Sequence, residues 1–471
     1  MSYTTWDIET TITTHLKRKG SPFTTVNWVV THAFKKKGGH VEEHRFGSTR
    51  PGRGWLLPVL AGTRLLVGFN IKFDLLHALQ DEDNLEAWME YVASGGNVWD
   101  CQLAEYLLCG MGQKDQMLSL DEVAPRYGGN VKVDEVKSLW AAGVNTHEIE
   151  PALLSRYLCG GPDETGTFQL GDVENTEKIA LAQIARAREC GQLNSILLNM
   201  GSLLCTIEME RNGMFVDKKL GLELAAELKT EIDKLKIELD NYLPKDLPFQ
   251  FNWGSAAQKS ALIFGGIVNY DSYEYDIDDL AGGSILQEDY DAAEVKPKLK
   301  YAQKDELHVT VAADTLHYKE GVQIPRSVAQ LDNVPVVRYS GGKNAGEVKT
   351  KKVKVDDLTK PKGRKVKAPY VFARITEPKE SWKTSTPGQY QTGADIIEEL
   401  GARGIPFLKA LASLTKLTKD LGTYFIVIDE ETGEAKGMLA LVDEHGIIHH
   451  SINHTSTVTA RFSSSSPNLY H

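Results

Sequence analysis

The chain has 471 residues and a mass of 52.2 kDa, enough for about three domains of roughly 150 residues each. A hydrophobic fraction of 41% and a charged fraction of 25% exclude a mainly disordered or fibrous protein. No apolar stretch reaches the roughly 18–20 residues that span a bilayer, and Met1–Glu9 lacks the features of a secretory leader. The five cysteines lack the paired spacing of a metal site and indicate free thiols. We therefore expect a cytoplasmic protein, neither secreted nor membrane-bound.

The net charge is -11, from 53 Lys and Arg against 64 Asp and Glu, which by itself argues against nucleic-acid binding. The charge is, however, unevenly distributed along the chain. Asp271–Glu294 holds nine acidic residues and no Lys or Arg, whereas Lys343–Lys367 holds ten basic residues and three acidic ones. The basic run, above all Lys349–Lys367, is a candidate for tracking duplex phosphates, and a solvated flexible loop is the alternative.

Residues 1–195 alternate between strand and helix patterns. Short apolar strands at Val26–Val30 and Leu65–Phe69 precede helical patterns at Leu75–Leu85 and Thr176–Cys190. This alternation predicts an α/β domain.

From Ile207 onward the pattern changes to long amphipathic helices. The first carries apolar residues three or four apart on one face: Leu220, Leu224, Leu228, Ile232, Leu235 and Leu239. A second helical block spans Ala394–Tyr424. Residues 265–385, between the two, have strand-like pieces and no long helix pattern, which predicts a β-rich insertion. Leu439–Asn453 alternates like a pair of strands around a turn.

The most informative residues are carboxylates. Asp7 and Glu9 lie two residues apart on an expected strand, so their oxygens face one volume. Asp74 opens a helix after Asn70, and Asp172 begins another helical pattern. Taken singly, each has a plain structural explanation: a solvated strand face or a first-turn helix acid. Hard divalent cations such as Mg²⁺ prefer oxygen ligands of this kind.

Taken together, these elements resemble the DEDD-type 3′–5′ proofreading exonuclease domain of family A, DNA-polymerase-I-like enzymes. That domain carries Asp-x-Glu, Asn-x-x-x-Asp and Tyr-x-x-x-Asp-x-x-x-Thr in this order. Trp99–Gln102 and Ser119–Ala124 stand where the domain has its middle elements. The exonuclease motifs alone would also admit a ribonuclease-D-like enzyme.

The resemblance implies a ribonuclease-H-like fold, a mixed sheet flanked by helices, that uses two divalent metal ions, Mg²⁺ or Mn²⁺. Asp7, Glu9 and Asp172 would hold one ion, and Asp7 would bridge to a second held by Asp74. The site would release nucleoside monophosphates from a DNA 3′ end. Where the family has its water-orienting tyrosine, this chain has Phe168. Either Tyr157 supplies the missing hydroxyl or the exonuclease is slow.

The second half resembles the thumb of the same family. The matching segments are Ile207–Asp217, Phe251–Lys259, Gln389–Asp395 and Leu414–Tyr424. In the exonuclease domain and this thumb, the resemblance implies DNA contacts from Asn70, Asn252, Ser255, Gln258, Lys259 and Lys416.

Residues 448–469 resemble the beginning of the family's palm, with Thr459-Ala460-Arg461-Phe462 in place of Thr-Gly-Arg-Leu. Thr459 and Arg461 are implied DNA contacts, because Arg461 would reach the minor-groove edge at the primer terminus. The palm aspartates, the fingers helix and the His-Asp-Glu turn are not in the sequence. The ending at Tyr470-His471 is the pattern expected where a gene is split.

We therefore expect the N-terminal portion of a phage-type family A polymerase, located in the host cytoplasm. It would comprise an exonuclease domain (1–195), a mainly α-helical thumb (196–435) with the β-rich insertion, and the start of an α/β palm (436–471). Its partners would be DNA, a second fragment carrying palm and fingers, and a processivity factor at the insertion. The alternatives are a DNA-binding or partner-recruiting fragment with weak exonuclease activity, and a stand-alone ribonuclease-D-like exonuclease.

Overall fold

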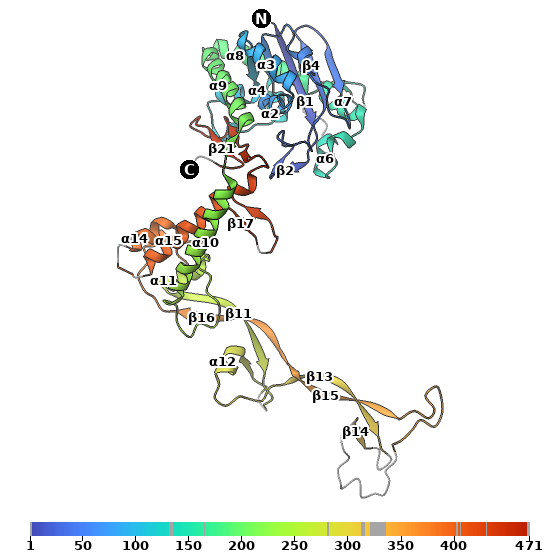
Figure 1. The fold of residues 1–471 in the computed structure, drawn as a ribbon, viewed down its shortest axis with the longest axis vertical. Helices are drawn as coiled ribbons and strands as arrows, with labels where there is room; N and C mark the ends of the chain where they lie inside the picture. The colour runs from blue at the N-terminus through green and yellow to red at the C-terminus, as the bar shows by residue number, and fades with distance from the viewer. Residues whose placement is uncertain are drawn as a thin grey trace. The chain divides into compact units, whose positions relative to one another are not determined.

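The computed structural model describes residues 2–130, 135–163, 165–279, 282–311, 316–320, 336–401, 404–405, 407–429 and 431–468. They form two compact units (Figure 1). The first unit contains Met1–Thr230 and Thr418–His471, and the second contains Glu231–Leu417. Tyr470-His471, to which the split-gene prediction refers, lies outside the described residues. In the part of the chain that is described, no helix is both long and apolar enough to cross a membrane.

The first unit is built on a five-stranded mixed sheet. Its order is β5 (Val41–Arg45), β4 (Val29–Lys36), β1 (Tyr3–Thr10), β6 (Leu65–Gly68) and β7 (Asn97–Asp100). The central strand β1 is antiparallel to β4 and parallel to β6, and β6 is parallel to β7. The predicted α/β character of this region is confirmed. The strand predicted at Leu65–Phe69 coincides with β6, whereas that predicted at Val26–Val30 overlaps β4 only at Val29 and Val30.

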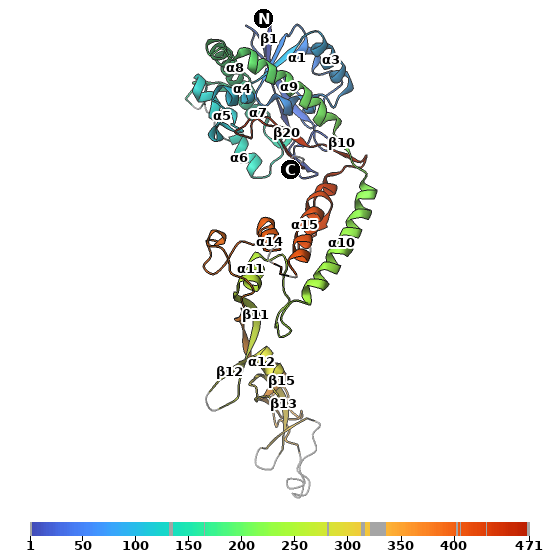
Figure 2. The same ribbon diagram turned by 90° about the vertical axis from the view of Figure 1, so that its left-hand side faces the viewer.

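The helices of the first unit cover both faces of the sheet. α8 packs against β1, β4 and β6, while α9 packs against β7 and α2 (Figure 2). The helices up to residue 212 are α1 (Leu57–Leu60), α2 (Ile71–Ala78), α3 (Glu82–Ala93), α4 (Cys101–Leu108), α5 (Leu120–Val123), α6 (Glu135–Ala141), α7 (Pro151–Cys159), α8 (Asp172–Glu189) and α9 (Leu193–Asn212). Because α9 runs through residue 195, that position is not a break in the fold.

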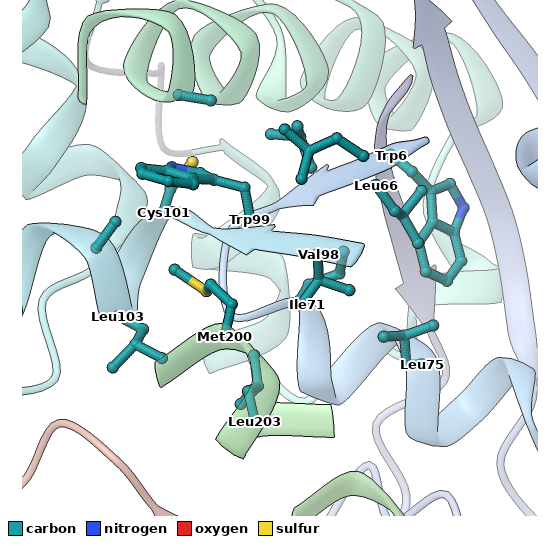
Figure 3. Packing of buried hydrophobic residues seen from close by; sticks show 14 of the residues in the cluster. Trp6, Leu66, Ile71, Leu75, Val98, Trp99, Cys101, Leu103, Met200 and Leu203 are labelled. Atoms are coloured by element: carbon teal, nitrogen blue, oxygen red, sulfur yellow. The ribbon is translucent and has the colours of Figure 1, made fainter. Parts of the chain in front are cut away.

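The core of this unit lies between the strands and these helices. Figure 3 shows Ile71 and Leu75 of α2, Val98 of β7 and Met200 of α9 meeting on one side of the strands. All four side chains are completely buried. Burying each side chain of this size contributes roughly 1.5–3 kcal/mol relative to leaving it exposed. The packing fixes α2 against the sheet, and α2 carries one of the candidate site residues.

The C-terminal residues also belong to the first unit. β10 (Met214–Phe215) pairs with β19 (Ile447–Ile448), and β20 (Ser451–Asn453) pairs with β21 (Ser463–Ser465). The strand pair predicted within Leu439–Asn453 is wrong for its first half, because Met438–Leu441 forms a 3-10 helix; both β19 and β20 follow the predicted turn and pair with other segments. The short hairpins of this unit are β2 (Thr14–His15) with β3 (Arg18–Lys19), β8 (Gly161–Pro162) with β9 (Phe168–Gln169), and β17 (Val427–Ile428) with β18 (Ala435–Lys436).

The second unit combines helices with long antiparallel strand pairs (Figure 1). β11 (Gly266–Asp276) pairs with β16 (Gly363–Phe372), and β13 (Tyr301–Thr310) pairs with β15 (Thr350–Pro361). The region predicted as a β-rich insertion is therefore rich in strands where it is described. Other described elements here are α11 (Ala256–Phe264), β12 (Ser284–Leu286), α12 (Gln287–Ala292), β14 (His317–Lys319), a 3-10 helix (Glu380–Trp382) and α14 (Ala394–Gly401).

Two helices extend from one unit into the other: α10 (Lys218–Asp240) and α15 (Leu408–Tyr424). On the predicted apolar face of α10, Ile232 and Leu239 are buried. Leu220 and Leu224 at its start are 50% and 40% exposed, respectively, so only the later part of the face is covered.

Candidate metal centre and nucleic-acid contacts

Asp7 and Glu9 lie on β1, the central strand of the sheet. β1 pairs with β4 along its length, with Asp7 opposite Ala33 and Glu9 opposite Thr31, and it pairs with β6 at Tyr3–Thr5. Successive strand residues point to opposite faces, so Ile8 enters the core while both carboxylates share the other face. Glu9 is buried and Asp7 half-buried. The strand pairing thus fixes the positions of the Asp7 and Glu9 backbones relative to each other.

Asp172 is the first residue of α8, and two glycines let it approach β1. A Cβ added to Gly171 would lie 2.2 Å from the Gly160 nitrogen and 2.5 Å from the Leu158 oxygen. Only glycine therefore allows the end of α7 and the start of α8 to pack this closely. One carboxylate oxygen from each of Asp7, Glu9 and Asp172 lies within 4.8 Å of the other two. The structure thus brings together three of the four predicted metal ligands.

The fourth predicted ligand, Asp74, lies in the first turn of α2 and is only 3% exposed. Its Oδ2 has no hydrogen-bond partner among the described residues. Burial raises the pKa of Asp74 well above its usual range, and the negative charges of Asp7, Glu9 and Asp100 raise it further. Asp74 is not one of the three residues whose carboxylate oxygens lie within 4.8 Å of one another, and its link to them is the repulsion from Asp7 and Glu9.

This donor set suits hard divalent cations. Four carboxylates from three elements offer only oxygen atoms, which Mg²⁺ and Mn²⁺ prefer. Holding several negative charges in a partly buried volume costs free energy, which the raised pKa of Asp74 reflects. A divalent cation would offset this cost and give the buried Asp74 Oδ2 a partner. The residues present therefore fit the predicted metal ions.

The two candidates for the water-orienting position lie on different elements. Tyr157 is on α7, and its ring meets Trp140 edge-on with the centroids 5.7 Å apart. Phe168 is on β9, opposite Pro162 of β8, and is 58% exposed. Whether Tyr157 or Phe168 takes part in the chemistry stays a prediction.

Two groups of predicted DNA contacts in the first unit are exposed. Asn70 precedes α2 in a left-handed conformation, φ 56° and ψ 41°, which asparagine adopts more readily than most residues. Thr459 and Arg461 lie between β20 and β21, and the Arg461 carbonyl accepts a hydrogen bond from Thr457 Oγ1 at 2.8 Å. Ala460 has φ 54°, a conformation that glycine adopts without strain. The glycine expected there by resemblance suits this conformation better.

The other predicted DNA contacts differ in exposure. Ser255 caps α11 by accepting from the Gln258 nitrogen at 3.3 Å, and Gln258 Oε1 accepts from the Asn252 nitrogen at 2.7 Å. Lys259 is only 8% exposed, and burial lowers its pKa. A phosphate contact would therefore require Lys259 to leave this position. Lys416, on α15, is exposed.

The acidic and basic runs pair with each other in the second unit. β11 carries part of the acidic run and β16 part of the basic run, and they are antiparallel neighbours. Lys367 forms an ion pair with Asp271 at 2.7 Å, and Arg364 with Glu274 at 2.8 Å. Part of the positive charge predicted to track phosphates is thus already matched within the unit.

Sequence reasoning gave no role to two buried acids of the first unit. Asp100 lies in the Trp99–Gln102 match, and Glu210 lies in the Ile207–Asp217 match. An acid that ends an apolar strand directly before a helix is typical of an N-cap. The capping role of Asp100 could therefore have been predicted from the sequence. Glu210 is completely buried inside α9, and its partners come from distant parts of the chain. No local pattern indicates its role.

Comparisons with known proteins give a likeness to solved structures. No protein-family model matches the chain, and no curated protein matches it. Among solved structures, the chain is similar to the POL domain of Pol1 from M. smegmatis in complex with DNA primer-template and dNTP. The sequence identity is 15% and the TM-score is 0.49, and the match covers 99% of this chain and 52% of that one. The chain thus spans about half the length of the structure it matches.

Proposed function

We propose that the chain is a metal-dependent 3′–5′ exonuclease that removes nucleotides from DNA 3′ ends. One observation carries the proposal: Asp7, Glu9 and Asp172 place carboxylate oxygens within 4.8 Å of one another. The buried Asp74 beside them adds a fourth carboxylate with a raised pKa. The order of these residues along the chain supports the same function, because it resembles the proofreading domain of family A polymerases.

Each site residue has a role in this proposal. Asp7, Glu9 and Asp172 would hold one divalent cation, while Asp7 and Asp74 would hold a second. Two bound cations lower the cost of deprotonating an attacking water and stabilise charge on the leaving 3′ oxygen. Asn70, exposed at the start of α2, would donate hydrogen bonds from its amide to the terminal nucleotide. Phe168 lacks a hydroxyl, so it would orient no water.

We further propose that the chain is the N-terminal portion of a phage-type family A DNA polymerase. The second unit would bind primer-template duplex, and DNA synthesis would need palm and fingers from another fragment. A processivity partner would bind the 265–385 insertion. The second candidate function, a DNA-binding or partner-recruiting fragment with weak nuclease activity, is favoured by Phe168 at the tyrosine position. A stand-alone ribonuclease-D-like exonuclease is disfavoured because residues 448–469 would have no role in it.

Removal of the metal tests the proposed reaction. With Mg²⁺, the purified chain is expected to shorten a 5′-labelled single-stranded DNA from its 3′ end and release 5′-mononucleotides. EDTA should abolish the release, and added Mg²⁺ should restore it. Comparing the digestion rates of this DNA and of RNA with the same sequence tests the ribonuclease-D-like alternative. We expect the chain to degrade the DNA faster than the RNA. A folded chain that binds DNA but releases few or no nucleotides would favour the DNA-binding or partner-recruiting alternative.

Neutralising the exposed lysines of β15 tests duplex binding. Lys351, Lys352 and Lys354 are exposed, and none has an ion pair among the described residues. Their triple replacement by glutamine should weaken duplex binding and lower the slope of log K against log salt by about 0.9 per lost phosphate contact. Fluorescence anisotropy at several salt concentrations measures both quantities.

The matched control neutralises three basic residues that are already ion-paired: Lys298 with Asp278, Arg364 with Glu274, and Lys367 with Asp271. This variant changes the net charge equally and should alter the salt slope less. An equal effect of the two variants would mean that net charge, not the β15 lysines, determines DNA affinity.

A further inference from the structure

We propose that Asp100 is a positioning residue that holds Asp74 in the metal centre by fixing the first turn of α2. This inference rests on the proposed function, because it concerns the same site. Asp100 ends β7, is 3% exposed, and lies opposite Gly68 of β6 in the parallel register. It therefore lies beside the point where the chain leaves β6 and enters α2.

The carboxylate of Asp100 joins two helix N-termini. Its Oδ2 accepts a hydrogen bond from the Ile71 nitrogen at 2.8 Å, and its Oδ1 accepts one from the Leu103 nitrogen at 2.9 Å. Ile71 is the first residue of α2, and Leu103 is in the first turn of α4. Since backbone amides occupy both oxygens, the structure assigns Asp100 a supporting role and not that of a further metal ligand.

α2 depends on this contact because it has no cap of its own. Asn70 makes no side-chain capping bond, so the first amides of α2 need an acceptor from elsewhere. The turn into the helix is also tight: a Cβ on Gly68 would lie 2.7 Å from Ile71 Cγ1. The Asp100–Ile71 hydrogen bond and this close packing together set where α2 begins.

Asp74 follows Ile71 by three residues, so the start of α2 determines its position. Asp74 Oδ2 has no hydrogen-bond partner among the described residues that would orient it independently. A small displacement of the first turn would move this carboxylate away from Asp7 and Glu9. The groups that support metal ligands commonly contribute 10–100-fold to metal affinity.

The test is Asp100→Asn, which keeps the shape of the side chain but turns one acceptor into a donor facing an amide. We expect the Mg²⁺ concentration for half-maximal exonuclease activity to rise about tenfold. The rate at saturating Mg²⁺ should recover to within about threefold of wild type. The affinity of the DNA-free protein for Mn²⁺, measured by electron paramagnetic resonance, should fall by the same factor. This measurement does not depend on exonuclease activity.

Asp81→Asn is the matched control. Asp81 caps α3, and its Oδ1 accepts from the Asn84 and Gly54 nitrogens, both at 3.0 Å; neither of these residues is a candidate metal ligand. It should lower stability without changing the metal requirement. A second variant, Asp100→Ser, can cap α4 with its single oxygen but cannot also serve α2, so it should show the same metal defect if Asp100→Asn folds poorly.

The outcomes separate the inference from the proposed function. If both Asp100 variants lower thermal stability as Asp81→Asn does and leave the Mg²⁺ requirement and Mn²⁺ affinity unchanged, Asp100 is only a helix cap and the inference is wrong. If the wild-type chain neither binds Mn²⁺ at Asp7 nor releases nucleotides, the proposed function fails, and the inference fails with it.

Discussion

Replacing Asp7 by alanine is expected to lower the rate of 3′-end removal by roughly 10³-fold. Removing one group that stabilises transition-state charge commonly costs on the order of 10²–10³ in rate, and Asp7 would contact both cations. One of its carboxylate oxygens lies within 4.8 Å of one from Glu9 and one from Asp172. Single-turnover digestion of 5′-labelled DNA measures the effect.

Two further variants serve as comparisons for this result: Asp7→Asn tests the role of the charge, and Glu42→Gln is the control. Asparagine keeps the size of the side chain and removes its charge, so Asp7→Asn should lose nearly as much activity as the alanine variant. Glu42 is an exposed acid on β5, at the edge of the same sheet, and Glu42→Gln should retain wild-type activity. If Asp7→Ala degrades DNA like the wild type, the site assignment is wrong.

Replacing Glu210 by alanine is expected to destabilise the first unit by about 3–5 kcal/mol, because breaking a buried ion pair leaves the other charge without compensation. Glu210 Oε1 lies 2.5 Å from Lys72 Nζ and accepts from the Ile452 nitrogen at 2.7 Å. The Lys72 side chain is 13% exposed and that of Glu210 is completely buried. One side chain thus joins α2, α9 and β20 within the unit.

Urea unfolding followed by tryptophan fluorescence measures this effect, because six of the eight tryptophans are in the first unit: Trp6, Trp28, Trp55, Trp88, Trp99 and Trp140. The matched control is Glu208→Gln on the same helix, where Glu208 pairs with Arg211 at 2.9 Å on the surface. That change should stay within about 0.5 kcal/mol. A Glu210→Ala effect as small as the control would contradict the account, whereas Lys72→Met combined with Glu210→Leu should recover part of the loss.

The local pattern of the sequence predicted that Asp7 and Glu9 share a face, whereas only the family resemblance joined Asp74 and Asp172 to them. A two-residue period places Asp7 and Glu9 on one strand face, and the structure brings Asp172 to the same volume. The approach of Asp172 depends on contact between Gly160 and Gly171, eleven residues apart, which no periodicity reveals. Local patterns predict which residues share a face, whereas backbone packing decides which faces meet.

Other features depend on pairing between distant segments. The basic run looked available for phosphates, but β16 is in register with the acidic β11, so Arg364 and Lys367 meet acids. Asp100 can accept hydrogen bonds from the first turns of both α2 and α4 only because β7 ends beside the start of α2. Glu210 likewise depends on Ile452, 242 residues away. Each of these interactions is set by tertiary packing and not by local sequence.

The most direct test of the central claim is a Mn²⁺ titration of the wild-type chain and Asp7→Ala, followed by electron paramagnetic resonance. We predict two bound Mn²⁺ per wild-type chain, with affinity falling as the pH is lowered, because protons compete for carboxylates such as Asp74, whose pKa is raised. Asp7→Ala should lose this binding. No saturable binding to the wild type, or the same stoichiometry and affinity in Asp7→Ala, would contradict the claim that these carboxylates form a metal centre.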